Sequence, residues 1–337
     1  MATPVTTASG TFGYGTEYAD LLDYTKLGAV TVKGIRRDPW PGNGMPRHCE
    51  VPGGLVNAIG LQGPGTDSFL ENYIPHYKMM AEKSVVRGGG GNGIPPLIVN
   101  IWGGSVEEYA EVAARLSESP YANPQSATGK MPVVPVSQPS THNSQPTTLN
   151  SQPLIGAIEC NVSCPNVKEG GHTFGQDPAV LARLVKAVRA ATKLPLIVKL
   201  APNVPDLRPY TAACEENGAD ALALINTIPA MVIDIRTRRP VLANVTGGLS
   251  GRCVHPVAVK CVYDAHRFSK LPILAMGGVY GWEDAVELML AGASAVAVGT
   301  ATFTAPDTAA KVADGIAAYC EANGFAAARD LTGAVCV

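Results

Sequence analysis

Several features that define particular classes of protein are missing from this sequence. No run of basic residues is longer than two, as at Arg36–Arg37, and the net charge is −2. Because nucleic-acid-binding domains carry a basic patch or stripe, we expect no binding to DNA or RNA. No apolar run approaches the ~20 residues of a membrane span, and residues 1–15 lack the charged and apolar regions of a secretory signal. We therefore expect a cytoplasmic protein without a membrane segment.

The cysteines lack the spacings of the usual structural sites. Eight cysteines are scattered over 337 residues, without a CxxC pair or a Cys/His cluster of zinc-finger type. Scattered cysteines in a long chain indicate a reducing compartment and not a disulfide framework. We expect no structural metal. Two cysteines, Cys160 and Cys164, nevertheless lie four residues apart in the segment ECNVSCPN.

Continuous apolar runs of strand length are abundant, and they alternate with helical patterns. Such runs are typical of parallel strands buried on both faces. Strict alternation over most of the chain predicts an α/β fold, a (β/α)8 TIM barrel. The expected strands lie in residues 28–33, 54–61, 96–103, 154–163, 194–201, 219–227, 271–278 and 293–300. The expected helices lie in residues 68–83, 105–118, 178–192, 206–218, 255–269 and 281–292. The run at 54–61 has the weakest strand propensity, because it contains two glycines.

Two segments do not fit a minimal barrel. Residues 233–245 predict a small β-hairpin around Thr237–Arg238. Residues 119–153 are rich in Pro, Ser, Thr, Gln and Asn and have no periodicity. Such a composition buries too little apolar surface to offset its ordering entropy, so we predict a flexible low-complexity insertion within one domain of residues 1–337. Its position after a helix and before a strand places it on the N-terminal face of the barrel, as a surface loop or as a contact with a partner.

Polar residues and glycines recur where the expected strands end. In a parallel barrel, reactive groups come from the C-terminal ends of the strands and the loops that follow. Their coincidence at so many strand ends predicts a functional site and argues against a non-catalytic scaffold. These residues are Lys33, Asn57, Asn100, Asn161, Lys199, Asn226, Thr227, Gly277, Gly278, Gly299 and Thr300.

The types of these residues indicate a ligand. Glycine clusters after the last two expected strands, together with GGLSG at 247–251, predict a phosphate-binding cradle of backbone amides. Asparagine side chains offer donors and acceptors together, which suits a heterocycle with alternating NH and C=O groups, or a sugar phosphate or polyol. Lys199 lies among apolar residues, where only an anionic partner stabilises its charge. Two roles suit it: a Schiff-base lysine, or a cation that faces a reduced flavin.

Strand alternation separates the two neighbouring cysteines. Side chains alternate between the faces of a strand, so Asn161 shares a face with Glu159 while Cys160 points the opposite way. If Asn161 faces the barrel interior, Cys160 is a packing residue against the helices. Cys164 follows the strand and belongs to the loop at its C-terminal end. A thiol there is a nucleophile, an acid or base, or a spectator.

Four segments together resemble the dihydroorotate dehydrogenase family, flavin enzymes of pyrimidine biosynthesis. They are GMPRHCEVPGGLVNAIGLQGPG (44–65), ECNVSCPNVKEGGHTFGQDP (159–178), LANVTGGLSG (242–251) and PILAMGGVYGWEDAVELMLAGASAVAVGTATF (272–303). The similarity covers nearly all of the chain except residues 119–153. NAIGLQ and NVKEGG resemble the NAD-linked class 1B catalytic subunit. The resemblance implies an FMN-containing (β/α)8 barrel that oxidises dihydroorotate to orotate.

The resemblance also implies roles for individual residues. Cys164 matches the base that removes the C5 proton while hydride leaves C6 for FMN. The positions that match substrate contacts are Lys33, Asn57, Ala58, Ile59, Gly60, Leu61, Asn161, Asn166, Asn226 and Thr227. The positions that match FMN contacts are Ser9, Lys33, Gly34, Asn100, Asn161, Lys199, Ile225, Gly251, Gly277, Gly278, Gly299 and Thr300.

A partner is implied as well. Class 1B catalytic subunits pass electrons to NAD⁺ through a second subunit that carries FAD and a 2Fe–2S cluster, and this sequence lacks a cluster-type cysteine spacing. We therefore expect a homodimer core within a heterotetramer. Three alternatives stay open: a fumarate-using class 1A-like enzyme, a dihydropyrimidine dehydrogenase-type subunit, and a flavin-free barrel with a Schiff base on Lys199. Lys33 favours a carboxylate-bearing substrate over an uncharged base.

Overall fold

The computed structural model describes residues 3–87, 93–122, 153–163 and 174–337. Within them, eight parallel strands form one sheet in the order β1-β14-β13-β8-β7-β6-β5-β2. The sheet closes between its first and last strands, because Thr6 forms a parallel bridge with Ala29 and the backbone N–H of Thr31 donates to Oγ1 of Thr7 at 2.9 Å. The strands are β1 (Val5–Thr7), β2 (Val30–Ile35), β5 (Leu97–Ile101), β6 (Ile155–Asn161), β7 (Leu196–Leu200), β8 (Ala221–Leu224), β13 (Ile273–Met276) and β14 (Ala295–Val298). The expected (β/α)8 barrel is confirmed.

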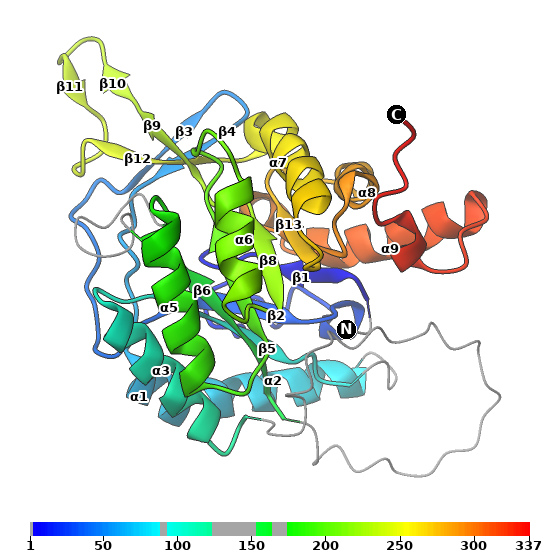
Figure 1. Ribbon diagram of the computed structural model, residues 1–337, viewed down its shortest axis with the longest axis horizontal. Coiled ribbons are helices and arrows are strands. Elements are labelled where there is room, and N and C mark those ends of the chain that lie inside the picture. The colour runs from blue at the N-terminus through cyan, green and yellow to red at the C-terminus, as the bar shows by residue number, and fades with distance from the viewer. Residues whose placement is uncertain (1–2, 88–92, 123–152, 164–173) are drawn as a thin grey trace.

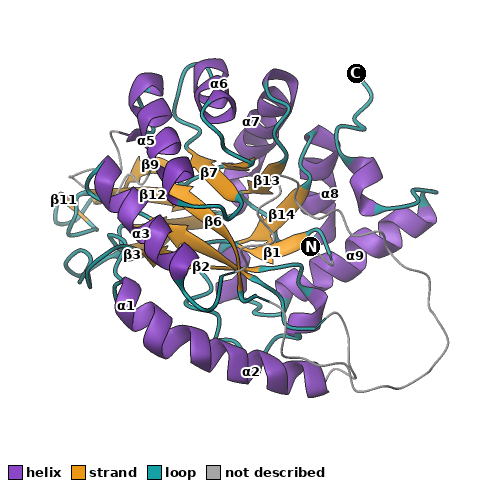
Figure 2. Ribbon diagram, turned by 60° about the horizontal axis from the view of Figure 1, so that its bottom comes forward, coloured by secondary structure: helices purple, strands orange, loops and turns teal. Residues whose placement is uncertain are grey.

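Helices surround the barrel (Figures 1 and 2). They are α1 (Thr66–Ser68), which a π-helical turn joins to α2 (Ile74–Arg87), then α3 (Val106–Glu118), α5 (Pro178–Ala191), α6 (Arg208–Glu216), α7 (His255–Phe268), α8 (Trp282–Ala291) and α9 (Thr308–Ala322). Helix starts follow local chemistry: Oγ of Ser105 accepts the N–H of Glu108, and Asp177 caps α5 with a proline at its first turn. α9 is not among the predicted helices, and its buried face is made largely of small residues. No helix in the described ranges is both long and apolar enough to cross a membrane.

One predicted barrel strand is wrong. Within 54–61, Gly54–Asn57 forms β4, which pairs antiparallel with β3 (His48–Val51) and β12 (Thr246–Ser250) in a separate sheet of order β3-β4-β12-β9. β9 (Ile228–Met231) completes this sheet, which Figure 1 shows on one side of the barrel. The eighth place in the barrel belongs to β1, whose three residues are too few to form a recognisable apolar run.

The predicted hairpin is confirmed. β10 (Ile233–Asp234) pairs antiparallel with β11 (Arg239–Pro240), and the side chain of Asp234 accepts the N–H of Arg236 in the turn between them. The hairpin extends away from the barrel beyond β9 (Figure 1).

Most of the predicted insertion lies outside the described residues, which omit 123–152. The residues that flank it lie together, since the N–H of Ile155 donates to the carbonyl of Tyr121 at 2.8 Å and Ala122 bridges to Ile155. Ile155 begins β6, so the described residues on either side of 123–152 lie at the N-terminal end of that strand.

Two apolar layers pack on opposite faces of the barrel strands. The outer layer joins strands to helices and includes Cys160, which has no solvent exposure. Burial raises the pKa of the Cys160 thiol well above its ordinary value, which disfavours a reactive thiolate. Cys160 is therefore a packing residue, as strand alternation predicts. The inner layer is rich in alanine, including Ala157 and Ala223, and these small side chains leave room for polar groups inside the barrel.

Candidate active site

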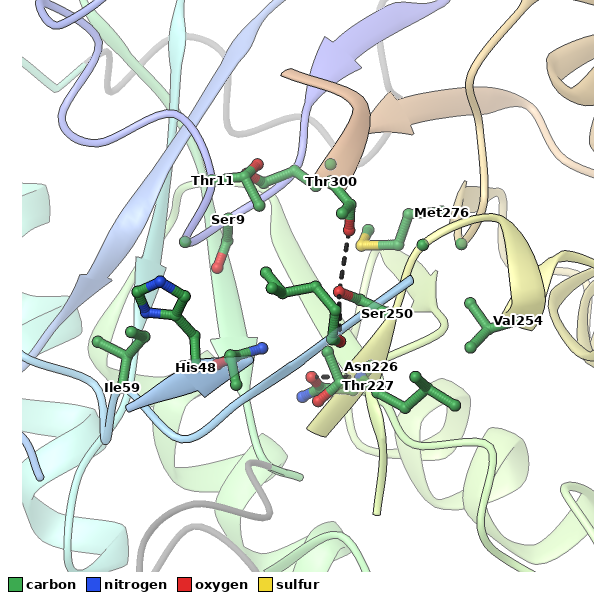
Figure 3. A pocket seen from close by; sticks show the side chains of 18 of the residues that line it. Ser9, Thr11, His48, Ile59, Asn226, Thr227, Ser250, Val254, Met276 and Thr300 are labelled. Carbon is green, nitrogen blue, oxygen red and sulfur yellow. Dashed lines mark hydrogen bonds between the residues drawn. The ribbon is translucent and has the colours of Figure 1, made fainter. Parts of the chain in front are cut away.

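A cavity of about 580 Å³ lies between the C-terminal ends of the barrel strands and the sheet of β3, β4 and β12 (Figure 3). Sites for small molecules usually measure ~300–1,000 Å³. The antiparallel sheet and the barrel both contribute side chains to the cavity. His48 and Glu50 come from β3, Asn57 from β4, and Asn161 and Lys199 from the ends of β6 and β7. The antiparallel sheet thus covers the face of the barrel on which reactive groups are expected.

Most of the predicted site residues line this single cavity. They are Ser9, Lys33, Gly34, Asn57, Ile59, Gly60, Leu61, Asn161, Lys199, Ile225, Asn226, Thr227, Gly251, Gly277, Gly278, Gly299 and Thr300. Cys164 and Asn166 lie outside the described residues, which end at Ser163 on this side and resume at Phe174.

Ala58 and Asn100 do not line the cavity. Ala58 is fully buried and packs with Val56 and Leu242 beneath the antiparallel sheet. Asn100 is fully buried inside the barrel, directly behind Gly34: a methyl group added to Gly34 would lie 2.9 Å from Oδ1 of Asn100. The missing side chain at Gly34 therefore leaves space between Asn100 and the cavity.

Hydrogen bonds fix the amide side chains of the cavity floor. Nδ2 of Asn226 donates to Oδ1 of Asn161 at 2.9 Å and to Oγ of Ser163 at 3.1 Å, and Oδ1 of Asn226 accepts the N–H of Thr227 at 2.8 Å. The hydroxyl of Ser163 donates in turn to the carbonyl of Lys199. Because these groups hold one another, they are oriented before a ligand arrives, and binding need not order them.

Glycines with left-handed backbone form the opposite end of the cavity. Gly251, Gly277 and Gly278 have φ angles of 107°, 127° and 74°. A methyl group on Gly278 would lie 2.6 Å from Cβ of His255, so this turn packs tightly against the start of α7. Nearby, Oγ1 of Thr300 donates to Oγ of Ser250 at 2.9 Å (Figure 3). Closely spaced backbone amides and hydroxyl groups of this kind suit a phosphate.

Two cations, Lys33 and Arg47, line the cavity. Lys33 belongs to β2, in the part where its pairing with β5 is irregular, and Arg47 precedes β3. Burial lowers the pKa of Lys33 below its ordinary value, and the neighbouring charge of Arg47 lowers it further. An anionic ligand between the two would relieve this repulsion, so the pair favours a carboxylate.

Several residues that line the cavity are absent from the predicted set: Thr11, Arg47, His48, Glu50, Ser250, Tyr280 and Phe303. Three of them belong to β3 or the residue before it, and strand-end reasoning about a barrel does not reach a separate antiparallel sheet. The segment MPRHCE (45–50) comes shortly before NAIG (57–60) in the sequence. This closeness to predicted site residues is the signal that could have identified Arg47, His48 and Glu50.

The fold and the cavity define a (β/α)8 barrel enzyme with a built anion cradle at its C-terminal face. The protein-family model described as dihydroorotate dehydrogenase matches residues 1–152 and 143–319, and the chain belongs to this family.

Curated relatives support a narrower placement. The catalytic subunit of dihydroorotate dehydrogenase B (NAD(+)) from Pelobacter propionicus is 43% identical over 335 residues, which cover 99% of this chain and 95% of the relative. The protein of the same name from Parabacteroides distasonis is 42% identical with the same coverage. Among solved structures, DHODH from Eimeria tenella in complex with ferulenol aligns with a TM-score of 0.72 over 98% of this chain and 85% of that chain. At 23% identity, that likeness concerns the fold.

Proposed function

We propose that this chain is the catalytic subunit of an NAD-linked dihydroorotate dehydrogenase, which oxidises dihydroorotate to orotate in pyrimidine biosynthesis with FMN in the cavity. One observation carries the proposal: residues from segments far apart in the sequence, expected to hold FMN and substrate, line one cavity. The relatives, which are named dihydroorotate dehydrogenase B (NAD(+)), catalytic subunit, support the same reaction.

The described residues fit FMN at both ends of the cavity. Gly277, Gly278 and Thr300 line one end of the cavity and would hold its phosphate. Lys199 lines the floor below, where its ammonium favours negative charge on the ring system. The buried Oδ1 of Asn100, behind Gly34, has no hydrogen-bond partner within the described residues and can accept from a ring N–H. FMN supplies the two-electron acceptor that no amino-acid side chain offers.

The remaining groups fit dihydroorotate, a cyclic ureide that bears a carboxylate. Lys33 and Arg47 supply positive charge for the carboxylate. Asn57, Asn161 and Asn226 supply amide donors and acceptors for the ring N–H and C=O groups. Dihydrouracil has no carboxylate, so the pair of cations argues against a dihydropyrimidine dehydrogenase-type reaction.

A base must accept the C5 proton of the substrate. Ser163 is buried, and its hydroxyl accepts from Asn226, which lines the cavity. We assign the base to the thiol of Cys164, the next residue in the sequence. Proton transfer to a positioned side chain contributes ~10²–10⁴-fold to a rate. Asn166 belongs to the same loop and is proposed as a substrate contact.

Electrons leave through another chain in this proposal. The cysteines of this sequence have no cluster-type spacing, and the relatives are named as catalytic subunits linked to NAD(+). We propose a cytoplasmic heterotetramer built on a homodimer of this chain, with partner subunits that carry FAD and a 2Fe–2S cluster. Copurification with an iron–sulfur flavoprotein from the native host supports NAD⁺ as the acceptor, whereas fumarate-dependent turnover by the isolated chain contradicts it.

The proposal is tested on purified protein with two substrates. We expect a yellow protein that contains FMN and forms orotate from dihydroorotate, with much slower or no oxidation of dihydrouracil. Oxidation of dihydrouracil at a rate equal to or above that of dihydroorotate contradicts the substrate assignment. A colourless protein in which borohydride traps a sugar phosphate on Lys199 would instead establish a Schiff-base enzyme.

A further inference from the structure

Glu159 is an enclosed carboxylate to which the proposed mechanism gives no role. It lies on β6 with no solvent exposure, among the small side chains of the barrel interior. Its Oε1 accepts Nδ2 of Asn100 at 2.5 Å and lies 3.9 Å from Nζ of Lys199. Its Oε2 has no hydrogen-bond partner within the described ranges. A buried carboxylate is costly unless a cation and hydrogen-bond donors compensate it. Lys199 and Asn100 provide this compensation, which indicates that the carboxylate acts together with them.

The strand register produces this group of three side chains. Asn100 of β5 is paired with Glu159 of β6, and Asn161, two residues further along β6, is paired with Lys199 of β7. Side chains two residues apart on a strand share a face, so the polar side chains of β5, β6 and β7 converge on one side of the barrel interior. Lys199 lines the cavity, whereas Glu159 does not. Glu159 therefore contacts Lys199 from behind, on the side away from a ligand.

We infer that Glu159 is a positioning residue for Lys199, which anchors the ammonium at the cavity floor and offsets part of its charge. Lys199 then stabilises a negatively charged ligand less than an unpaired lysine would, and its ammonium is shared between the carboxylate and the ligand. Asn100 holds the carboxylate in place through its amide. This inference rests on the proposed function, in which Lys199 lines the site that would hold FMN, whose reduced form carries more negative charge.

The test is a double-mutant cycle read out as the midpoint potential of bound FMN, measured by equilibration with a reference dye. Glu159→Gln keeps the size of the side chain and an acceptor for Asn100 but removes the charge. In the wild-type background, it is expected to shift the flavin equilibrium toward the reduced form by about tenfold, which is ~30 mV for a two-electron couple. In a Lys199→Gln background, the same change is expected to shift it by less than about threefold. No shift in the wild-type background, or equal shifts in both, overturns the inference.

Asp220→Asn is the matched control. Asp220 accepts Nη1 of Arg189 at 2.8 Å and precedes β8, at the opposite end of the barrel from the cavity, so loss of its charge is expected to leave the potential unchanged. If Glu159→Gln does not fold, Glu159→Asp takes its place in the cycle and is expected to give a smaller shift of the same sign. The double variant removes both charges of the pair, which buried sites tolerate better than loss of one.

FMN binding and dihydroorotate oxidation by the wild-type protein distinguish a failure of this inference from a failure of the proposed function. A wild-type protein that binds FMN but does not oxidise dihydroorotate contradicts the function, while the cycle still decides the role of Glu159. A wild-type protein that binds no FMN overturns both.

Discussion

Replacement of Gly278 in the phosphate cradle is expected to lower both the stability of the protein and its affinity for FMN. Gly278 has a φ angle of 74°, and a methyl group on it would lie 2.6 Å from Cβ and 3.0 Å from Cα of His255. In Gly278→Ala, the left-handed backbone costs ~1–2 kcal/mol, and overpacking against α7 costs a further ~1–3 kcal/mol. The total, ~2–5 kcal/mol, is a large part of the ~5–15 kcal/mol that stabilises a typical domain.

Gly324 is the matched control for this prediction, because its φ angle is 75° and no atom lies within 4 Å of the position of an added methyl group. Gly324→Ala is therefore expected to cost only the backbone contribution, ~1–2 kcal/mol. Both free energies of unfolding are measured by denaturant titration, and the dissociation constant of FMN is measured by fluorescence. We expect Gly278→Ala to lose at least ~1 kcal/mol more than Gly324→Ala and to bind FMN about tenfold more weakly or worse. Equal losses of stability, together with wild-type FMN affinity in Gly278→Ala, would refute the cradle.

Three further predictions concern the substrate end of the cavity. Cys164→Ala is expected to lower turnover by ~10²–10⁴-fold while FMN is retained, whereas Cys160→Ala is expected to keep near wild-type turnover; equal losses in steady-state assays contradict the assignment. Lys33 loses its charge as the pH rises through its lowered pKa, so the KM for dihydroorotate is expected to rise at a pH below the ordinary lysine pKa of 10.5. A KM that is independent of alkaline pH in both the wild-type protein and Lys33→Met speaks against the carboxylate contact. Asn226→Ala leaves Asn161 without its donor and is expected to cost ~1–3 kcal/mol of stability and to raise KM, as thermal unfolding and kinetics will show; an unchanged KM excludes a role in substrate binding.

The site residues at the C-terminal ends of the barrel strands could be predicted from the sequence, because the strands concerned are strongly apolar. The apolar runs whose C-terminal ends carry Asn161, Lys199 and Gly277 are long enough to identify as buried strands, and parallel topology brings these ends together. Strand alternation likewise separates Cys160, which is buried in the outer apolar layer, from the loop that follows β6. In these cases, local periodicity is sufficient to predict the structure, since the burial of a strand and the face to which each side chain points both follow from it.

Elements whose pairing is set by distant residues were not predictable in this way. β1 has three residues, and its place beside β14 depends on tertiary pairing that no local pattern shows. β4 was placed in the barrel, yet it pairs with β12, almost two hundred residues further along the chain. The same sheet brings Arg47, His48 and Glu50 to the cavity. The sequence pattern also places Asn100 at the cavity surface, whereas Asn100 is fully buried behind Gly34 and does not line the cavity.

The central claim is that dihydroorotate reduces a flavin held in this cavity. The most direct measurement is to mix purified protein with dihydroorotate without oxygen and to follow the visible absorbance of the flavin together with orotate formation. We expect loss of the oxidised-flavin absorbance, with one orotate formed for each flavin reduced, and a much slower change in Cys164→Ala. Flavin that stays oxidised in the wild-type protein in the presence of excess dihydroorotate would contradict it.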